Sequence, residues 1–202
     1  MRKRTNFSWL CMSAILLVMS CLCSCSPSPK GCVITGQVKA GEYEGRMVCL
    51  CDPYTHAVLD SVSVRDGKFR FIPKDSVEDF LPLRLNLSDD DLFPITLPVV
   101  TEKGTVRTVL GELVLTSGTP LNDALQDFLL AVDRFSDEMA KSGKEAAEMR
   151  GEFMHLLETS ILQNRSNPIG VYIFRTYSNR LTSERRAAVL EKAGEEFRKK
   201  IE

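Results

Sequence analysis

The chain has 202 residues, which is enough for one or two domains with a substantial buried core. Its 26 basic and 27 acidic residues nearly cancel, and no basic stripe runs through the sequence, which argues against nucleic acid as a partner. A content of 44% hydrophobic and 26% charged residues excludes a disordered or collagen-like chain.

Residues 1–24 have the order of a secretory signal peptide. A positive head at residues 2–4 precedes an apolar run over 7–19, and small residues follow. The run is too short for a transmembrane anchor, and no later apolar run is long enough to cross a bilayer. We therefore expect the protein to be exported and this leader to be removed.

The end of the leader resembles a bacterial lipobox, in which a small residue precedes a cysteine that is lipidated. Two tetrapeptides fit, one ending at Cys21 and the other at Cys25. We favour Cys25, because residues 25–31 then form a polar, proline-rich tether, whereas cleavage at Cys21 would leave Leu22 and two more thiols at the mature end. Several acyl chains on one cysteine would make a stable membrane anchor.

The residue after Cys25 is Ser26 rather than aspartate. By resemblance to Gram-negative lipoprotein sorting, this predicts the outer membrane. An acidic surface-export tag is absent, which favours the periplasmic face.

Residues 32–117 have the pattern of an antiparallel β domain, either a sandwich or an open barrel. Turn residues separate short apolar runs, and Asp66-Gly67 predicts a tight hairpin turn. The first two runs are expected to be joined by a glycine-containing turn over 41–45. About eight strands are predicted, at 32–38, 47–51, 58–64, 68–72, 81–88, 95–101, 105–110 and 112–116.

Residues 118–202 have the period of helices, which makes the fold class α+β. Thr119 is a suitable N-cap and Pro120 a suitable first helical residue. Three to four helices are predicted, with Asn167-Pro168 ending the second and Thr182 capping the last. They cover about 120–141, 144–163, 169–177 and 183–201.

Several segments together resemble one family. They are Ile34-Thr-Gly36, residues 59–71 (LDSVSVRDGKFRF), residues 117–122 (SGTPLN) and residues 164–172 (NRSNPIGVY). This combination, after a lipobox, resembles the N-terminal part of Bacteroidetes lipoproteins that carry domain of unknown function 4369. In many of those proteins a thioredoxin-like domain follows. Here the sequence stops at Glu202, where that domain would begin, and it has no Cys-x-x-Cys, so the family's redox chemistry is not carried over.

Three cysteines follow the tether: Cys32, Cys49 and Cys51. They permit a disulfide in an oxidising compartment, but an odd number leaves at least one unpaired within the chain. If Ile34 faces Val48 or Leu50, Cys32 shares their face and the other two point away; a one-residue shift of the turn places Cys32 opposite Cys51. Cys49 and Cys51 are poor partners for each other. The alternative is three small buried hydrophobic residues.

No pattern selects a metal site, a cofactor or a catalytic centre. Glu152-x-x-His155 is half of a di-iron motif without its second half, and His56 is expected in a turn. Residues 89–91 (Asp-Asp-Asp) lack the spacing of a calcium loop. We therefore expect neither a metal nor a cofactor, and no enzyme.

Two serines match the short Asp-Ser-apolar sites at which Bacteroidetes glycosylate exported proteins. Ser76 lies in a polar connection and is the better candidate for O-glycosylation, because loops are exposed. Ser61 lies in a predicted strand.

The sequence favours a non-catalytic, lipid-anchored binding or interaction module in the periplasm. Its partners would be the membrane, through the anchor, and a thioredoxin-like periplasmic protein. Apolar residues 169–174 and the helix that begins near Leu121 would supply a docking surface if the absence of the thioredoxin-like domain leaves them uncovered. The alternatives are a redox accessory protein that acts through Cys32, Cys49 or Cys51, and a truncated remnant of an oxidoreductase.

Overall fold

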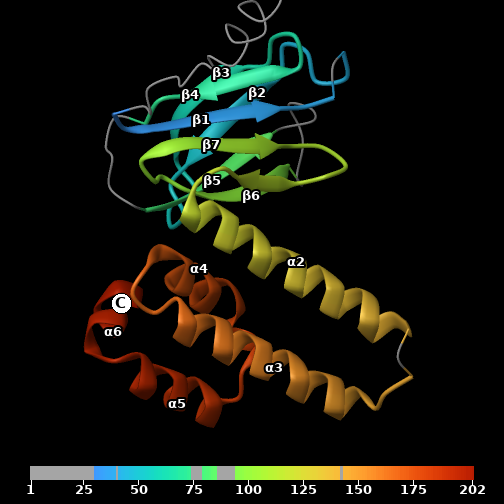
Figure 1. The fold of residues 1–202 in the computed structure, drawn as a ribbon, viewed down its shortest axis with the longest axis vertical. Helices are drawn as coiled ribbons and strands as arrows, with labels where there is room; N and C mark the ends of the chain where they lie inside the picture. The colour runs from blue at the N-terminus through green and yellow to red at the C-terminus, as the bar shows by residue number, and fades with distance from the viewer. Residues whose placement is uncertain (1–29, 40, 74–78, 86–93, 142) are drawn as a thin grey trace, which may run out of the picture.

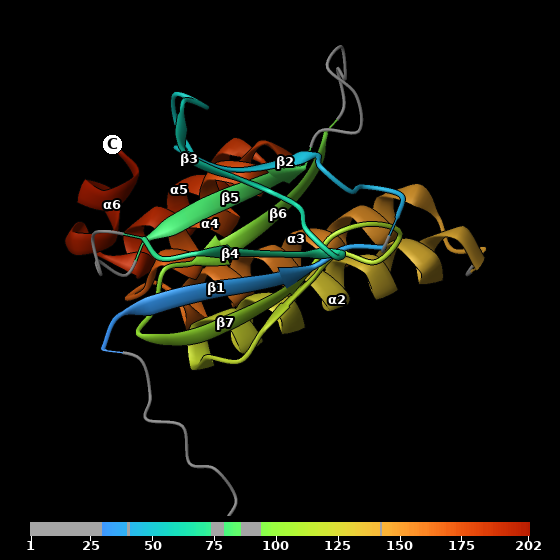
Figure 2. The same ribbon diagram turned by 90° about the horizontal axis from the view of Figure 1, so that it is seen from above.

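The computed structural model describes residues 30–39, 41–73, 79–85, 94–141 and 143–202, in which two four-stranded sheets are followed by helices (Figures 1 and 2). The strands are β1 (Cys32–Gln37), β2 (Met47–Cys51), β3 (Val58–Ser63), β4 (Lys68–Phe71), β5 (Phe80–Leu85), β6 (Ile95–Val100), β7 (Gly104–Val109) and β8 (Leu115–Ser117). The α+β fold class and the β-sandwich are thereby confirmed, and an open barrel is not formed.

Sheet A has the order β4-β1-β7-β8, and sheet B has the order β3-β2-β5-β6. Sheet B is antiparallel throughout, but β1 and β7 run parallel in sheet A. The prediction of a purely antiparallel domain is therefore wrong for this pair. The expected glycine-containing turn over 41–45 is present, with Gly41 and Gly45 at φ values of 82° and 77°, but it leads from sheet A to sheet B, so β1 and β2 do not pair with each other.

The core of the sandwich comes from the alternation of side chains along each strand. Ile34 pairs with Phe71 on one side and with Val106 on the other, and all three are buried. The facing side chains of sheet B include Val48, Leu50, Leu83, Leu85, Leu97 and Val99. Next to Ile34 on the same face, Gly36 leaves room for the ring of Phe69, which lies where a Cβ on Gly36 would stand.

One hairpin joins the two sheets. Asp66 and Gly67 have φ values of 51° and 66°, and Arg65 and Lys68 exchange two backbone hydrogen bonds of 2.9 Å. This is the turn that Asp66-Gly67 predicts. Glu44 holds it in place, because its carboxylate accepts hydrogen bonds from the N–H groups of Asp66 and Gly67.

The helical part begins at Pro120, as predicted. Its elements are α2 (Pro120–Lys141), α3 (Ala146–Gln163), α4 (Pro168–Tyr177), the short 3-10 helix η1 (Ser178–Arg180), α5 (Ser183–Ala193) and α6 (Glu195–Ile201). The single last helix of the prediction is two helices, because Gly194 has a φ of 89° and interrupts the helical backbone. The described part of the chain thus contains five α-helices rather than three or four.

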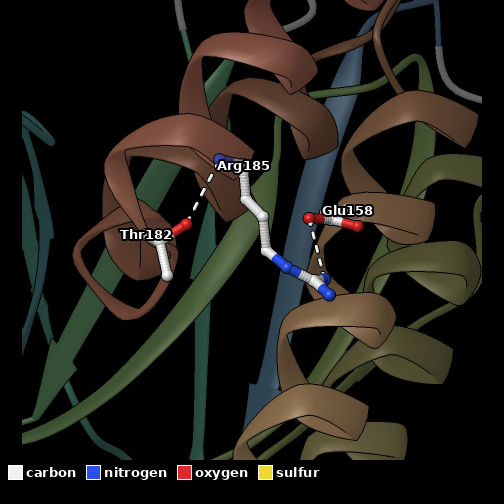
Figure 3. A network of polar contacts seen from close by, with 3 residues as sticks. All are labelled: Glu158, Thr182 and Arg185. Carbon is white, nitrogen blue, oxygen red and sulfur yellow. Dashed lines mark hydrogen bonds and ion pairs between the residues drawn. The ribbon is translucent and has the colours of Figure 1, made fainter.

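A second hydrophobic core holds these helices together. It includes Leu125 and Phe128 of α2, Leu157 of α3, Ile173 of α4 and Phe197 of α6. Two polar contacts at the start of α5 support this packing (Figure 3). Thr182 accepts a hydrogen bond from the Arg185 N–H, and the Arg185 guanidinium forms an ion pair of 3.1 Å with Glu158 of α3.

Helix α2 connects the two parts of the molecule. It packs against β8 and β6, which are edge strands of the two sheets on the same side of the sandwich. Its buried Asn122 forms hydrogen bonds with Val100, Thr116 and Thr119. From this end α2 runs away from the sandwich, with α3 beside it (Figure 1). No helix among the described residues is both long and apolar enough to cross a membrane.

Candidate functional site

The three thiols predicted as a redox or disulfide site are buried and unpaired. Cys32 lies on the inner face of β1 with Ile34, whereas Cys49 and Cys51 lie on the face of β2 opposite to the core residues Val48 and Leu50. This is the first of the two predicted arrangements, in which Cys32 faces the core and the other two thiols point away from it. It arises across the sandwich rather than within a hairpin, and a sheet therefore separates Cys32 from the other two thiols.

Burial makes the thiols of Cys32 and Cys51 poor nucleophiles. It raises the pKa of the Cys32 thiol to about 11. It also raises the pKa of Cys51, although the nearby guanidinium of Arg84 opposes this effect. Because the thiolate is the reactive form, both thiols are protonated and unreactive at neutral pH.

Of the residues predicted to be modified, the structure describes only Ser61. Ser61 is exposed on β3, an edge strand of sheet B. Its N–H donates a hydrogen bond to the Asp60 carboxylate at 2.8 Å. Cys21, Cys25 and Ser76 lie outside the described residues, as does the acidic run 89–91.

The residues weighed as metal ligands do not converge. Glu152 forms an ion pair of 2.6 Å with Lys144, and His155 is exposed on the same helix. His56 lies in the turn after β2, with a φ of 58°. In the part of the chain that the structure describes, no group of three histidine, cysteine or acidic side chains could hold a metal ion.

The two segments predicted to supply a docking surface differ in their burial. Ile169, Ile173 and Phe174 are fully or almost fully buried in the helical core, whereas Val171 and Tyr172 are half-buried and line a separate hollow. The prediction is therefore wrong for Ile169, Ile173 and Phe174, because α4 packs against α3, α6 and β5. Helix α2 is different: Leu125 and Phe128 in its first half are buried, but no residue from 131 to 141 is.

An apolar groove lies between the second half of α2 and the first half of α3. We call it the α2–α3 groove and define it by Phe135, Met139, Met149, Phe153 and Tyr177. The rings of Phe135 and Phe153 stack at 5.0 Å between centroids and form its floor, and Tyr177 meets Phe153 edge-on at 6.5 Å. The hollow has a volume of about 760 Å³.

Charged side chains border the groove on two sides. Arg150 of α3 and Arg180 of η1 line its hollow, which no carboxylate of the described residues lines, whereas Glu138 and Glu152 line a neighbouring hollow that shares Phe135, Met139 and Met149. Met139 remains 48% exposed, so the apolar floor reaches the surface. Such an arrangement can bury the apolar face of a partner and attract acidic side chains beside that face.

The sequence pattern contained only part of this groove. The sequence predicts that the helix beginning near Leu121 supplies part of a docking surface, and Phe135 and Met139 of this helix line the groove. A period of 3.6 residues identifies a face but does not tell whether another element covers it. Arg150 and Arg180 were missed, since nothing in their spacing relates them to that helix.

Comparison with known proteins adds no relative: no family model, no curated protein and no solved structure matches this chain. The resemblance to lipoproteins with domain of unknown function 4369 therefore stays a prediction from its motifs.

Proposed function

We propose that this protein is a non-catalytic binding module that is held at the outer membrane by a lipid on Cys25. The observation that carries the proposal is the α2–α3 groove, with its stacked aromatic floor, its exposed Met139 and its two rim arginines. Methionine and aromatic side chains are common in grooves that accept apolar helices, because they adapt to different shapes. The occupant we propose is an amphipathic helix of a periplasmic protein whose apolar face is flanked by Asp or Glu.

The position of the groove supports this role. The tether would join the sandwich at Cys32, and a seven-residue tether can span at most about 25 Å from the lipid. The helices α2 and α3 extend away from the sandwich (Figure 1). The groove is therefore at the end of the molecule that is remote from the start of β1, where a partner in solution can approach it.

The state of the thiols supports a role without catalysis. A dithiol reductase needs an accessible, low-pKa thiolate with a second cysteine within reach. Cys32 is buried in the sandwich with a raised pKa, and a sheet separates it from Cys49 and Cys51. This arrangement gives no support to the redox alternative.

Photo-crosslinking in living cells tests the proposal. A photoreactive benzoylphenylalanine is placed at Met139 or, as the control, at Asp137, which lies two residues away and therefore on nearly the opposite side of α2. We expect adducts from position 139 alone, and we expect mass spectrometry to map them to a partner segment with apolar residues at helical spacing. The substitutions Arg150→Glu and Arg180→Glu together should strongly reduce the yield of this adduct.

Three results would overturn the proposal. Equal adducts from both positions would show that the groove is not selective, and no adduct from position 139 would show that it is empty. An adduct with a second copy of this chain would assign the groove to self-association instead.

A further inference from the structure

The outer face of sheet A gathers basic side chains from separate parts of the chain. In the register of the sheet, Thr35 of β1 pairs with Arg70 of β4 on one side and with Arg107 of β7 on the other. Lys68 lies two residues before Arg70 on the same face, next to Gln37. Alternation places these side chains opposite to the buried Ile34 and Phe69, so all of them point away from the core.

A groove of about 750 Å³ runs over this face. It extends from Arg65 in the hairpin between the sheets, across β4, β1 and β7, to Ser117 of β8. We call it the sheet A groove, and its four cations are Arg65, Lys68, Arg70 and Arg107. The described helices do not cover this face, because they lie below the sandwich (Figure 1). The groove is thus open to a ligand.

The charge of the sheet A groove is not balanced locally. None of its described lining residues is acidic, and none of its four cations forms an ion pair with a described carboxylate. Glu44, beside the hairpin, is engaged by two N–H groups of the turn. Four cations without an ion pair to a described carboxylate mark this groove as a site for an anion.

The spacing of the cations indicates more than one anionic group. Arg70 and Arg107 flank β1, so their Cα atoms lie roughly 10 Å apart, which is two strand spacings. The Arg107 side chain crosses Gly118, since a Cβ on Gly118 would stand 2.9 Å from Arg107 Nη1. The four cations are spread from Arg65 in the hairpin to Arg107 of β7, so an extended ligand with repeated charges can contact more of them than one small anion can.

The remaining lining residues favour an acidic sugar over a nucleic acid as the ligand. The hydroxyl and amide groups of Gln37, Ser63 and Ser117 lie among the cations, together with apolar Val62, Val109 and Leu115, while the hydroxyls of Thr35 and Thr108 donate to backbone carbonyls. Phe69 is the one aromatic residue among the described lining, and its ring packs on Gly36 in the core. Nucleic-acid bases would therefore find no stacking platform, while sugar hydroxyls would find hydrogen-bonding partners.

We propose that the sheet A groove binds an acidic oligosaccharide, with Arg70 and Arg107 holding successive carboxylate or sulfate groups. Guanidinium groups form two parallel hydrogen bonds with such groups. This inference goes beyond the α2–α3 groove and does not depend on it, because the two sites share no residue.

Fluorescence polarisation with the whole protein and labelled sugars tests the inference. The probes are a heparin oligosaccharide, an oligogalacturonate and neutral dextran. We expect the two acidic sugars to bind, more weakly as salt is added, and dextran not to bind. The double variant Arg70→Gln, Arg107→Gln should raise both dissociation constants by roughly tenfold or more, because two charged hydrogen-bond donors are lost.

The matched control is the double variant Lys103→Gln, Lys192→Gln, which removes the same charge from two exposed positions outside the groove. It should bind both sugars as the wild type does, and so should Met139→Glu in the α2–α3 groove. A similar loss in the control, or no loss in the Arg70 and Arg107 variant, would overturn the inference. Competition by polyphosphate or anionic vesicles that exceeds the competition by both sugars would assign the groove to phosphate instead.

Discussion

The side chain of Asn122 gives Val100 both of the hydrogen bonds that a neighbouring strand would supply. The Val100 N–H donates to Asn122 Oδ1 at 2.9 Å, and Asn122 Nδ2 donates to the Val100 carbonyl at 2.8 Å. Val100 is the last residue of β6, so a residue of α2 continues the pairing at the end of this strand. Asn122 is completely buried and couples the helical core to the sandwich through this contact.

Replacement of this amide is expected to be costly. Asn122→Ala should lower the free energy of unfolding by about 3 kcal/mol, because it leaves the buried Val100 N–H without its partner and removes the hydrogen bonds of Asn122 with Thr116 and Thr119. The control Asn179→Ala changes an exposed asparagine and should cost less than about 0.5 kcal/mol. Urea unfolding measures both. Equal midpoints for the two variants would contradict the role of Asn122.

Two helical glycines should respond in opposite ways to the same substitution. A Cβ on Gly151 in α3 meets no atom within 4 Å, so Gly151→Ala should stabilise the protein by about 0.5–1 kcal/mol. A Cβ on Gly170 in α4 would overlap the carbonyl of Asn164, so Gly170→Ala should destabilise it by about 1–3 kcal/mol. Thermal unfolding of the two variants gives the signs, and a shared sign would refute the packing at Gly170.

The buried thiol of Cys32 should make stability depend on alkaline pH. Its pKa is raised from the ordinary 9.0 to about 11, so between these values the unfolded chain loses a proton that the folded protein keeps. The stabilisation is therefore complete below pH 9 and is lost as the pH rises through 11. We expect the difference in unfolding midpoint between wild type and Cys32→Ala to shrink from pH 8 to pH 11. Parallel profiles would indicate an exposed thiol.

The protein should have no thiol–disulfide reductase activity of its own. Insulin reduction with dithiothreitol should proceed at the same background rate for wild type and for a variant in which all three thiols are serine. The reason is the burial of Cys32, Cys49 and Cys51. A rate for wild type that clearly exceeds the variant's would favour the redox alternative over the binding module.

The lipid anchor is expected on Cys25. Labelling of cells with a fatty-acid probe should be lost in Cys25→Ser and retained in Cys21→Ser, because only the removal of the acceptor abolishes acylation. The opposite pattern would move the mature start to Cys21 and leave Cys23 and Cys25 as thiols of the tether.

Local pattern predicted most of the elements but not their partners. The Asp66-Gly67 turn, the start at Pro120 and the cap at Thr182 depend on neighbouring residues, and the structure confirms all three. The parallel pairing of β1 with β7 has no local signal, since alternation along a strand is the same in either direction. The break at Gly194 was missed because apolar residues at helical spacing continue on both sides of it.

The two grooves were hidden from the sequence for different reasons. Arg70 and Arg107 are 37 positions apart and become neighbours only when both strands join β1. Neither arginine belongs to a run of basic residues in the sequence, so the sequence alone indicates no basic stripe. Phe135 and Met139 do belong to a visible stripe, but the divergence of α2 from the body leaves their end of it uncovered.

The order of the strands also sets how this protein must fold. The chain passes between the two sheets four times, and Thr35 finds its hydrogen-bonding partner Val106 only 71 positions later. Closing so long a loop costs conformational entropy before the stabilising contacts can form. A high contact order therefore slows folding to milliseconds or longer. During synthesis β1 emerges early and has no parallel neighbour until β7 follows. Its Val33 and Ile34 stay exposed to other chains for that interval, which is when aggregation would compete with folding.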